Sequence, residues 1–203
     1  MTKIKFCGLS REQDIQAANQ LLPDYIGFVF AKNSKRYVSE VQAAKLKSLL
    51  SPAIKAVGVF VDEKVEVVAD LLNRGVIDIA QLHGNEDGSY VDRLKSLTDK
   101  KILQAFKINA KQDVLRAKSS GCDFVLLDGG SGDGKTFDYS LIKDFDRPFF
   151  LAGGLTADNL QSALSLKPYA VDCSSGIETN GAKDPAKMAD FIQTIRRFEL
   201  KGE

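Results

Sequence analysis

The feature that most constrains the fold of this chain is a regular alternation of strand signals and helix signals along its length. Short apolar runs, typical of strands buried on both faces, alternate with amphipathic segments bounded by capping residues, Gly or Pro. The predicted strands cover residues 3–7, 25–30, 54–61, 77–82, 102–106, 124–127, 149–152 and 170–173. The predicted helices cover residues 11–22, 39–50, 62–74, 90–97, 111–119, 139–145, 156–166 and 185–199.

Eight strand–helix pairs that follow one another without a long linker predict one parallel sheet. Eight strands close a (β/α)8 barrel, and a chain of 203 residues is long enough to build one. We therefore expect an α/β fold, a (β/α)8 TIM barrel that occupies residues 1–203 as a single domain. The alternative is a doubly wound open sheet, which commonly has fewer strands.

Local patterns predict where several helices begin. The Ser-x-x-Gln segments at 10–13 and 39–42 are typical of capping boxes. Asp62 is predicted to cap the third helix. Asp184 followed by Pro185 predicts an N-cap with proline at the first helical position.

Composition excludes several classes of protein. Lys and Arg number 28 and Asp and Glu number 27, so a net charge of +1 gives no overall basic bias towards nucleic acid. No apolar run approaches the ~18 residues of a membrane span, and the N-terminus is too polar for a signal peptide. Three widely spaced cysteines without Cys-x-x-Cys spacing argue against disulfides and structural zinc and favour a reducing cytoplasm. A single His nearly excludes a His-based metal site.

In such a barrel the active site lies at the C-terminal ends of the strands, and two side chains with useful chemistry follow this rule. Cys7 ends the first strand, where it is either a structural thiol packed like a small hydrophobe or a reacting group. Asp128 follows four apolar residues, so desolvation there would raise its pKa and suit it to general acid catalysis. The alternative for Asp128 is a loop cap bonded to the amides of Gly129 and Gly130.

Two small-residue loops predict a phosphate site. Gly153 and Gly154 lie between a strand and a helix N-terminus, where bare amides and the helix dipole suit an anion. Ser174, Ser175 and Gly176 follow the next strand and can supply further donors. Barrels frequently bind phosphate between the loops of strands seven and eight, so the two loops support each other.

Two further polar residues follow strands. Arg36 lies in the loop behind the second strand, where it either pairs bidentately with a substrate carboxylate or is a solvated surface arginine. His83 ends the fourth strand and is either a substrate contact or a structural histidine.

Residues 129–136 match the nucleotide-binding pattern G-x-x-x-x-G-K-[ST] letter for letter. That pattern requires a long helix that starts at the Lys-Thr pair, with its N-terminus on the phosphates. Here the pair leads into Phe-Asp-Tyr and a short helical segment in the middle of the chain, which disfavours nucleotide binding.

Taken together, several segments resemble the phosphoribosylanthranilate isomerases of tryptophan biosynthesis, in the same order and over nearly the whole chain. They are Lys-Phe-Cys-Gly-Leu-Ser at 5–10, Gly-Phe-Val-Phe at 27–30, Ser-Lys-Arg-Tyr-Val at 34–38, Gln-Leu-His-Gly-Asn-Glu at 81–86, Leu-Asp at 127–128, Gly-Lys-Thr-Phe-Asp at 134–138, Gly-Gly-Leu at 153–155 and Asp-Cys-Ser-Ser-Gly-Ile-Glu at 172–178. The same family loop explains the nucleotide-like pattern. Departures from the family pattern are small and occur at Lys35, Asn85, Tyr139 and Cys173.

The resemblance implies a reaction without a cofactor, the Amadori rearrangement of N-(5-phosphoribosyl)anthranilate to 1-(2-carboxyphenylamino)-1-deoxyribulose 5-phosphate. It implies that Asp128 protonates the ring oxygen and that Cys7, as a thiolate, removes the proton from C2′. A free thiol has a pKa near ~8.5, so the site is expected to favour the thiolate of Cys7.

The resemblance also assigns binding roles. Arg36 would hold the anthranilate carboxylate, the loops at 153–154 and 174–176 would hold the phosphate, and His83 and Asp172 would contact the substrate. The implied partner is a small phosphorylated substrate, with no nucleic acid and no membrane. We expect a cytoplasmic protein that is a monomer or a weak homodimer.

Two other functions stay open at this stage. One is a related sugar-phosphate barrel such as the histidine-pathway isomerase, which resembles this chain but has Asp at the first-strand position, so Cys7 argues against it. The other is a non-catalytic protein that binds a phosphorylated ligand on the same fold. The presence of both Cys7 and Asp128 disfavours it.

Overall fold

The computed structural model describes residues 1–129 and 137–201, in which eight parallel strands form a closed barrel in the order β1 to β8. The strands are β1 (Lys3–Cys7), β2 (Tyr25–Val29), β3 (Lys55–Phe60), β4 (Ile79–Leu82), β5 (Lys101–Lys107), β6 (Phe124–Asp128), β7 (Phe149–Ala152) and β8 (Ala170–Cys173). Pairing of β1 with β8 closes the barrel and sets Lys5 opposite Asp172. The predicted (β/α)8 barrel is therefore confirmed, and the open sheet is excluded.

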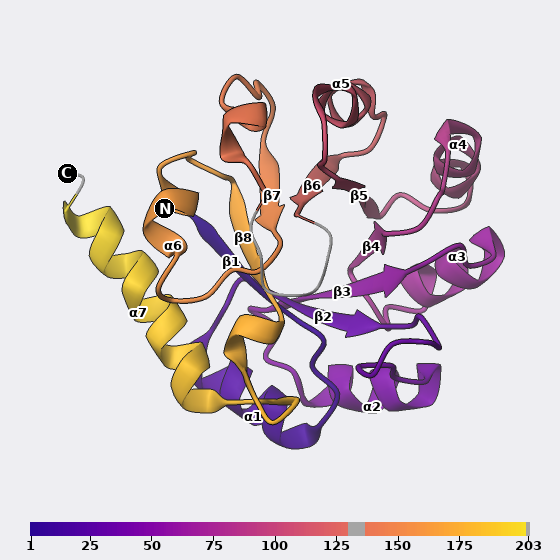
Figure 1. Cartoon of the computed structure of the whole chain (residues 1–203). Helices are drawn as coiled ribbons and strands as arrows, with labels where there is room; N and C mark the ends of the chain where they lie inside the picture. The colour runs from indigo at the N-terminus through magenta and orange to yellow at the C-terminus, as the bar shows by residue number, and fades with distance from the viewer. Residues whose placement is uncertain (130–136, 202–203) are drawn as a thin grey trace.

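Helices surround the strands, as Figure 1 shows. They are α1 (Glu12–Leu21), α2 (Glu40–Leu49), α3 (Val65–Asn73), α4 (Gly88–Leu97), α5 (Lys111–Ser119), the 3₁₀ turn η1 (Tyr139–Ile142), α6 (Leu160–Leu164), the 3₁₀ turn η2 (Ser175–Ile177) and α7 (Pro185–Lys201). A small hairpin of β9 (Glu178–Thr179) and β10 (Ala182–Lys183) follows β8. Every barrel strand agrees with its predicted range to within two residues at each end. No helix in the described part of the chain has the length and apolarity needed to cross a membrane.

One predicted helix is much shorter than expected. The helix predicted over 156–166 is reduced to α6, because the side chain of Asn159 holds the preceding residues in a turn. Its Nδ2 donates to the carbonyl of Gly154 at 2.8 Å, and its Oδ1 accepts from the amide of Thr156 at 2.9 Å. These bonds fix the loop behind β7 instead of extending the helix.

The start of α1 also differs from its prediction. Asp14, and not Gln13, is the residue that reaches back: its Oδ2 accepts from the backbone amides of Ser10 and Arg11, both at 3.0 Å. The helix begins after Arg11. The predicted Ser10–Gln13 capping box is therefore wrong, because an ionised carboxylate is the stronger acceptor for two amides.

At two further positions an aspartate forms hydrogen bonds that make the observed helix start differ from the predicted one. Asp62 does not cap α3, which begins after Lys64; its carboxylate instead accepts from the backbone amide of Asn85 at 2.6 Å. Asp138 accepts from the amide of Ser140 at 2.9 Å and closes a tight turn. The helix predicted over 139–145 is accordingly only the 3₁₀ turn η1.

Of the other two predicted helix starts, one is confirmed in part and the other in full. Ser39 caps α2 by accepting from the amide of Gln42 at 3.2 Å, but the Gln42 side chain donates to the carbonyl of Ser10, so only half of that box forms. Asp184 caps α7 as predicted, since its Oδ1 accepts from the amides of Ala186 at 2.9 Å and Lys187 at 3.3 Å.

Side chains alternate between two cores because successive residues of a strand point to opposite faces. One core lies between strands and helices and includes Ile4 and Phe6 of β1. The other fills the barrel interior and consists of Tyr25, Val57, Ile79, Leu103, Leu126, Phe150, Ala152 and Ala170. One step further along the interior face, several strands carry polar residues, among them Lys5, Gln81, Asp128 and Asp172. The interior is therefore apolar at one end and polar at the C-terminal mouth.

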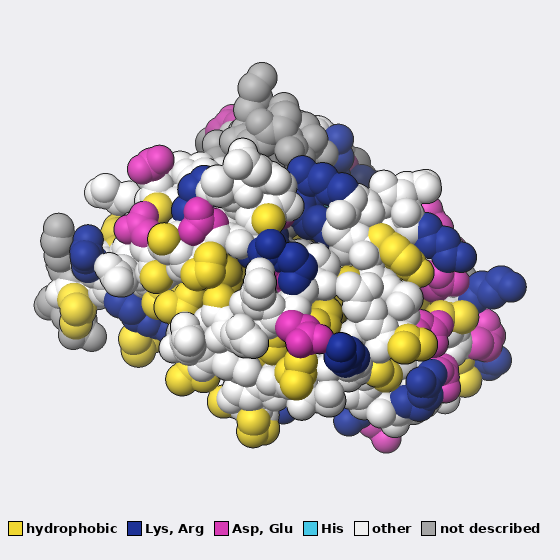
Figure 2. All heavy atoms as spheres, turned by 90° about the horizontal axis from the view of Figure 1, so that it is seen from below, with side chains coloured by type: hydrophobic (Ala, Val, Ile, Leu, Met, Phe, Trp, Pro, Cys, Tyr) yellow, Lys and Arg dark blue, Asp and Glu magenta, His cyan; other side chains and the backbone are white. Residues whose placement is uncertain are grey.

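On the surface that includes α1, α2 and α7, side chains of both charges are interspersed with apolar ones (Figure 2). The ion pair between Lys45 of α2 and Glu12 of α1, at 2.6 Å, is one example. Both side chains are exposed, so the pair contributes little to stability.

Phe150 is the central ring of the barrel interior, and its truncation tests that core. It is 1% exposed, and its ring centroid lies 5.4 Å from that of Tyr25, 5.7 Å from Phe124 and 5.6 Å from Tyr169. We expect Phe150→Ala to lower the free energy of unfolding by about 3–5 kcal/mol, measured by urea denaturation. Val41→Ala, at an 82% exposed position, is the control and should change it by less than ~0.5 kcal/mol. Equal effects of the two variants would contradict a packed interior.

Candidate active site

A pocket of about 230 Å³ lies at the C-terminal mouth of the barrel. Its lining residues are Cys7, Val29, Ser34, Arg36, Val59, Gln81, His83, Asp128, Ala152, Gly153, Gly154, Leu155, Asp172, Ser174 and Ser175. We call it the mouth pocket. It brings together every predicted site residue except Gly176, from strands and loops far apart in the sequence.

Cys7 points into the barrel, on the face of β1 opposite to Ile4 and Phe6. A glycine on the neighbouring strand makes room for it. A β-carbon at Gly27 would lie 2.8 Å from the Cys7 sulfur, closer than real contacts allow. The sequence therefore places the Cys7 thiol and the space for it on adjacent strands.

The electrostatics around Cys7 are set by a buried ion pair. Lys5 is fully buried, and its Nζ donates to Asp172 Oδ2 at 2.7 Å. Burial lowers the pKa of Lys5, but the charge of Asp172 and its hydrogen bond outweigh burial, so the pKa of Lys5 is raised overall. A charged ammonium thus lies beside the thiol. Lys5 was not among the residues predicted for the site, although its position two residues before Cys7 on the same strand face was a usable signal.

The pKa of Cys7 is shifted in the opposite direction to the one expected, which was a shift that favours the thiolate. Burial raises the pKa of the Cys7 thiol, and the positive charges of Lys5 and Lys183 offset only part of that effect. The free site therefore favours the thiol and not the thiolate, because desolvation of the anion outweighs the attraction of nearby ammonium groups.

Asp128 lies beside His83, with His83 Nε2 3.3 Å from Asp128 Oδ2. The amide nitrogen of Gln81 is 2.9 Å from His83 Nδ1. In this orientation of the amide its nitrogen donates to Nδ1, which leaves the imidazole proton on Nε2, towards Asp128. Gln81 is 1% exposed and was not among the predicted site residues. The alternative in which Asp128 caps backbone amides involves Gly130, which lies outside the described residues.

Arg36 is not a solvated surface arginine, because it binds Glu178 through two hydrogen bonds. Its Nε donates to Oε1 at 2.6 Å and its Nη2 to Oε2 at 2.8 Å. Lys183 Nζ also donates to Oε1 of Glu178, at 2.7 Å. Although burial raises the pKa of Glu178, the bonds from Arg36 and Lys183 lower it to about 2. Glu178 appeared in the sequence only as part of a motif, and Lys183 was missed.

The loop behind β8 holds its residues in different ways. The Ser174 hydroxyl donates to the carbonyl of Cys7 at 3.0 Å, so it ties the loop to β1. A β-carbon at Gly176 would lie 1.9 Å from the carbonyl oxygen of Leu155, so Gly176 is needed for close packing against the loop behind β7 and does not line the mouth pocket. Cys173 donates to that same Leu155 oxygen, with its sulfur at 3.1 Å. The two predicted phosphate loops therefore lie side by side.

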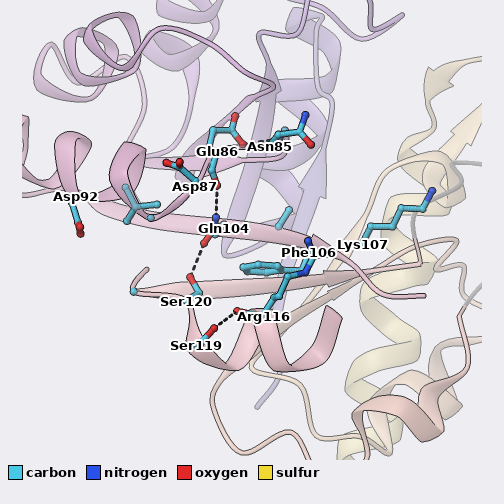
Figure 3. Close-up of a pocket in the computed structure, with 15 residues that line it drawn as sticks. Asn85, Glu86, Asp87, Asp92, Gln104, Phe106, Lys107, Arg116, Ser119 and Ser120 are labelled. Carbon is cyan, nitrogen blue, oxygen red and sulfur yellow. Dashed lines mark hydrogen bonds between the residues drawn. The ribbon is translucent and has the colours of Figure 1, made fainter. Parts of the chain in front are cut away.

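A larger hollow, of about 740 Å³, lies outside the barrel between β5, α4 and α5 (Figure 3). Several of its polar side chains bond to one another or to the backbone. Gln104 donates to the Glu86 carbonyl at 2.8 Å and accepts from the Ser120 hydroxyl at 2.7 Å, and the Glu86 carboxylate accepts from backbone amides. The hollow contains none of the predicted site residues, so the mouth pocket is the candidate active site. The nucleotide-like segment 129–136 lies outside the described residues from 130 onwards.

Comparisons with known proteins agree on one family. Residues 4–194 match the family model of N-(5'-phosphoribosyl)anthranilate (PRA) isomerase. The N-(5'-phosphoribosyl)anthranilate isomerase of Endomicrobium trichonymphae is 44% identical, and the match covers 97% of this chain and 99% of the relative. The crystal structure of phosphoribosyl anthranilate isomerase from Thermotoga maritima has a TM-score of 0.88 at 34% identity, covering 97% of this chain and 100% of the other. A structure of that enzyme type in complex with reduced 1-(o-carboxyphenylamino)-1-deoxyribulose 5-phosphate has a TM-score of 0.86 at 33% identity, with coverage of 97% and 100%.

The raised pKa of Cys7 gives a prediction for the free protein. Because burial raises it above the ordinary thiol value, the Cys7 thiolate should form only above pH ~8.5. The measurement is thiolate absorbance in the ultraviolet, taken as the difference between wild type and Cys7→Ser so that Cys122 and Cys173 cancel. A midpoint below the ordinary thiol value would show that the neighbouring ammonium groups dominate.

Proposed function

This chain belongs to the N-(5'-phosphoribosyl)anthranilate isomerase family, and we propose that Cys7 and Asp128 are the base and the acid with which it carries out the isomerisation. The reaction is the Amadori rearrangement of tryptophan biosynthesis. It converts a phosphoribosylated aromatic amine into an open-chain aminoketose phosphate. Hydrogen and electrons move within one molecule, so no external oxidant or reductant is needed to balance it.

The first step opens the furanose ring. Asp128, protonated, gives its proton to the ring oxygen as the bond from that oxygen to C1′ breaks. The lone pair of the anthranilate nitrogen forms a double bond to C1′, which gives a protonated Schiff base. His83 supports this role because its Nε2 lies 3.3 Å from Asp128 and keeps the carboxyl oriented. A bound substrate also excludes water, which favours the uncharged carboxyl.

The second step removes the proton from C2′. The Cys7 thiolate takes it, the C2′–H electrons form a double bond to C1′, and the electrons of the C1′–N double bond return to nitrogen. The resulting enolamine tautomerises to the ketone, with the new hydrogen on C1′. The buried ammonium of Lys5 supports this role, because its charge stabilises the thiolate and offsets part of the effect of burial on the pKa of Cys7.

The positions of the two groups carry the proposal. Cys7 ends β1 and Asp128 ends β6, and these strands are not neighbours in a barrel where β1 pairs with β2 and β8. A ribose held in the mouth pocket would therefore have the acid and the base on different sides, as the two steps require. The reactive state has Cys7 as the thiolate and Asp128 as the carboxylic acid. It holds as many protons as the state with Cys7 as the thiol and Asp128 as the carboxylate, so it can form from that state without a change of net charge.

The remaining residues of the mouth pocket would bind the substrate. Arg36 would hold the anthranilate carboxylate through charge-assisted hydrogen bonds. The phosphate would lie between the loops that carry Gly153–Gly154 and 174–176, with Gly176 acting through packing. His83 and Asp172 would contact the sugar from the same pocket.

Replacement of either reacting group tests the proposal. We expect Cys7→Ala and Asp128→Ala each to lower kcat by at least ~10², the scale of general acid–base catalysis. The substrate is fluorescent and short-lived, so it is generated in situ from anthranilate, phosphoribosyl pyrophosphate and the preceding transferase. The enzyme-dependent loss of fluorescence measures turnover.

Matched controls separate chemistry from folding. Cys122→Ala removes another buried thiol, and Asp146→Ala removes a carboxylate whose side chain is 76% exposed. Both variants should turn over like wild type. An active Cys7→Ala variant would remove Cys7 as the base, and an active Asp128→Ala variant would remove Asp128 as the acid.

A further inference from the structure

The contact between Arg36 and Glu178 occupies one particular edge of the guanidinium. Glu178 accepts from Nε at 2.6 Å and from Nη2 at 2.8 Å, which is the side edge of the fork. A guanidinium has a second edge, formed by Nη1 and the other proton of Nη2, with the same spacing for a carboxylate. Glu178 therefore fixes the plane of Arg36 and leaves its end edge for a second carboxylate.

Glu178 is itself held in place. Its side chain is 6% exposed, and Lys183, 2% exposed, donates to its Oε1 at 2.7 Å. The two residues face each other in the β9–β10 hairpin. A buried carboxylate between two cations stays ionised, in agreement with a pKa of about 2 for Glu178. This makes Glu178 a rigid support and not a mobile surface side chain.

Hydrogen bonds also connect Lys183, through Ser174, to the proposed base Cys7. Lys183 Nζ donates to the Ser174 carbonyl at 2.9 Å, and the Ser174 hydroxyl donates to the carbonyl of Cys7 at 3.0 Å. One continuous network thus joins Arg36, Glu178, Lys183, Ser174 and Cys7. It fixes the distance between the group that would hold the aromatic carboxylate and the group that would act on C2′.

We propose that Glu178, braced by Lys183, is a positioning residue that orients the end edge of Arg36 towards the aromatic carboxylate of the substrate. This inference rests on the proposed role of Arg36. It assigns recognition of the aryl carboxylate to a pair of residues, of which only Arg36 touches the ligand. The opposite relation, in which Glu178 competes with the substrate for Arg36, predicts the opposite effect of its removal.

The test compares two ligands by isothermal titration calorimetry. One is the reduced product analogue with its ring carboxylate, and the other is the same compound without that carboxylate. Wild type should bind the first more tightly by a ratio on the order of 10 to 100, because charged hydrogen bonds are strong. Glu178→Gln should lower this ratio on the order of tenfold by weakening binding of the carboxylate ligand alone.

Glu178→Asp is a second variant, for use if Glu178→Gln does not fold. Its side chain is too short to accept from both Nε and Nη2 of Arg36, so it should also lower the ratio. Glu66→Gln is the matched control, since Glu66 forms an exposed pair with Arg93 at 3.9 Å, and it should leave the ratio at the wild-type value. In turnover assays Glu178→Gln should raise KM more than it lowers kcat.

Three results would overturn the inference. An unchanged ratio would remove Glu178 from recognition, a higher ratio would make it a competitor, and equal loss for both ligands would make its role only structural. Arg36→Met separates these results from the role of Arg36 itself. If wild type and Arg36→Met show the same ratio, Arg36 does not hold the carboxylate, and the inference fails together with that role.

Discussion

The buried ion pair between Lys5 and Asp172 is the interaction on which the rest of the candidate active site depends. The two residues are opposite each other in the register of β1 and β8, the pair of strands that closes the barrel. Both are buried, so each needs the other; removal of one partner would cost about 3–5 kcal/mol through the charge left behind. The pair joins the first strand to the last and places a positive charge beside Cys7.

This pair also marks the boundary between two parts of the barrel interior. Below it, rings and aliphatic side chains such as Phe150 and Leu126 fill the space and hold the strands at fixed distances. Above it, the same inward-facing positions carry Cys7, His83 and Asp128. The apolar part supplies rigidity, and the polar part has its groups placed by strands whose positions the core fixes. A small ligand in this mouth therefore meets side chains that are already oriented before it binds.

Much of this could be predicted from the sequence, because strand signals and the position of a residue at a strand end are local. The barrel follows from such signals, and so does the position of Cys7, Asp128 and the two predicted phosphate loops at its C-terminal mouth. Glu178 could not be assigned a role in this way, since its partner Arg36 is 142 positions away and only the fold brings them together. The direction of the Cys7 pKa was wrong because it depends on burial against charge, a balance that no motif encodes. The predicted start of α1 was wrong because the side chain of Asp14, and not that of Gln13, accepts the hydrogen bonds from the backbone amides that precede the helix.

The most direct test of acid and base on different sides of the ribose is a crystal structure of this protein with the reduced product analogue. In that structure we expect the Cys7 sulfur to lie roughly 3.5 Å from C2′. We also expect an Asp128 oxygen to lie within about 3.2 Å of the hydroxyl derived from the ring oxygen, on another side of the sugar. If C2′ faces away from Cys7, or if Asp128 contacts only the phosphate or the aromatic ring, the central claim is contradicted.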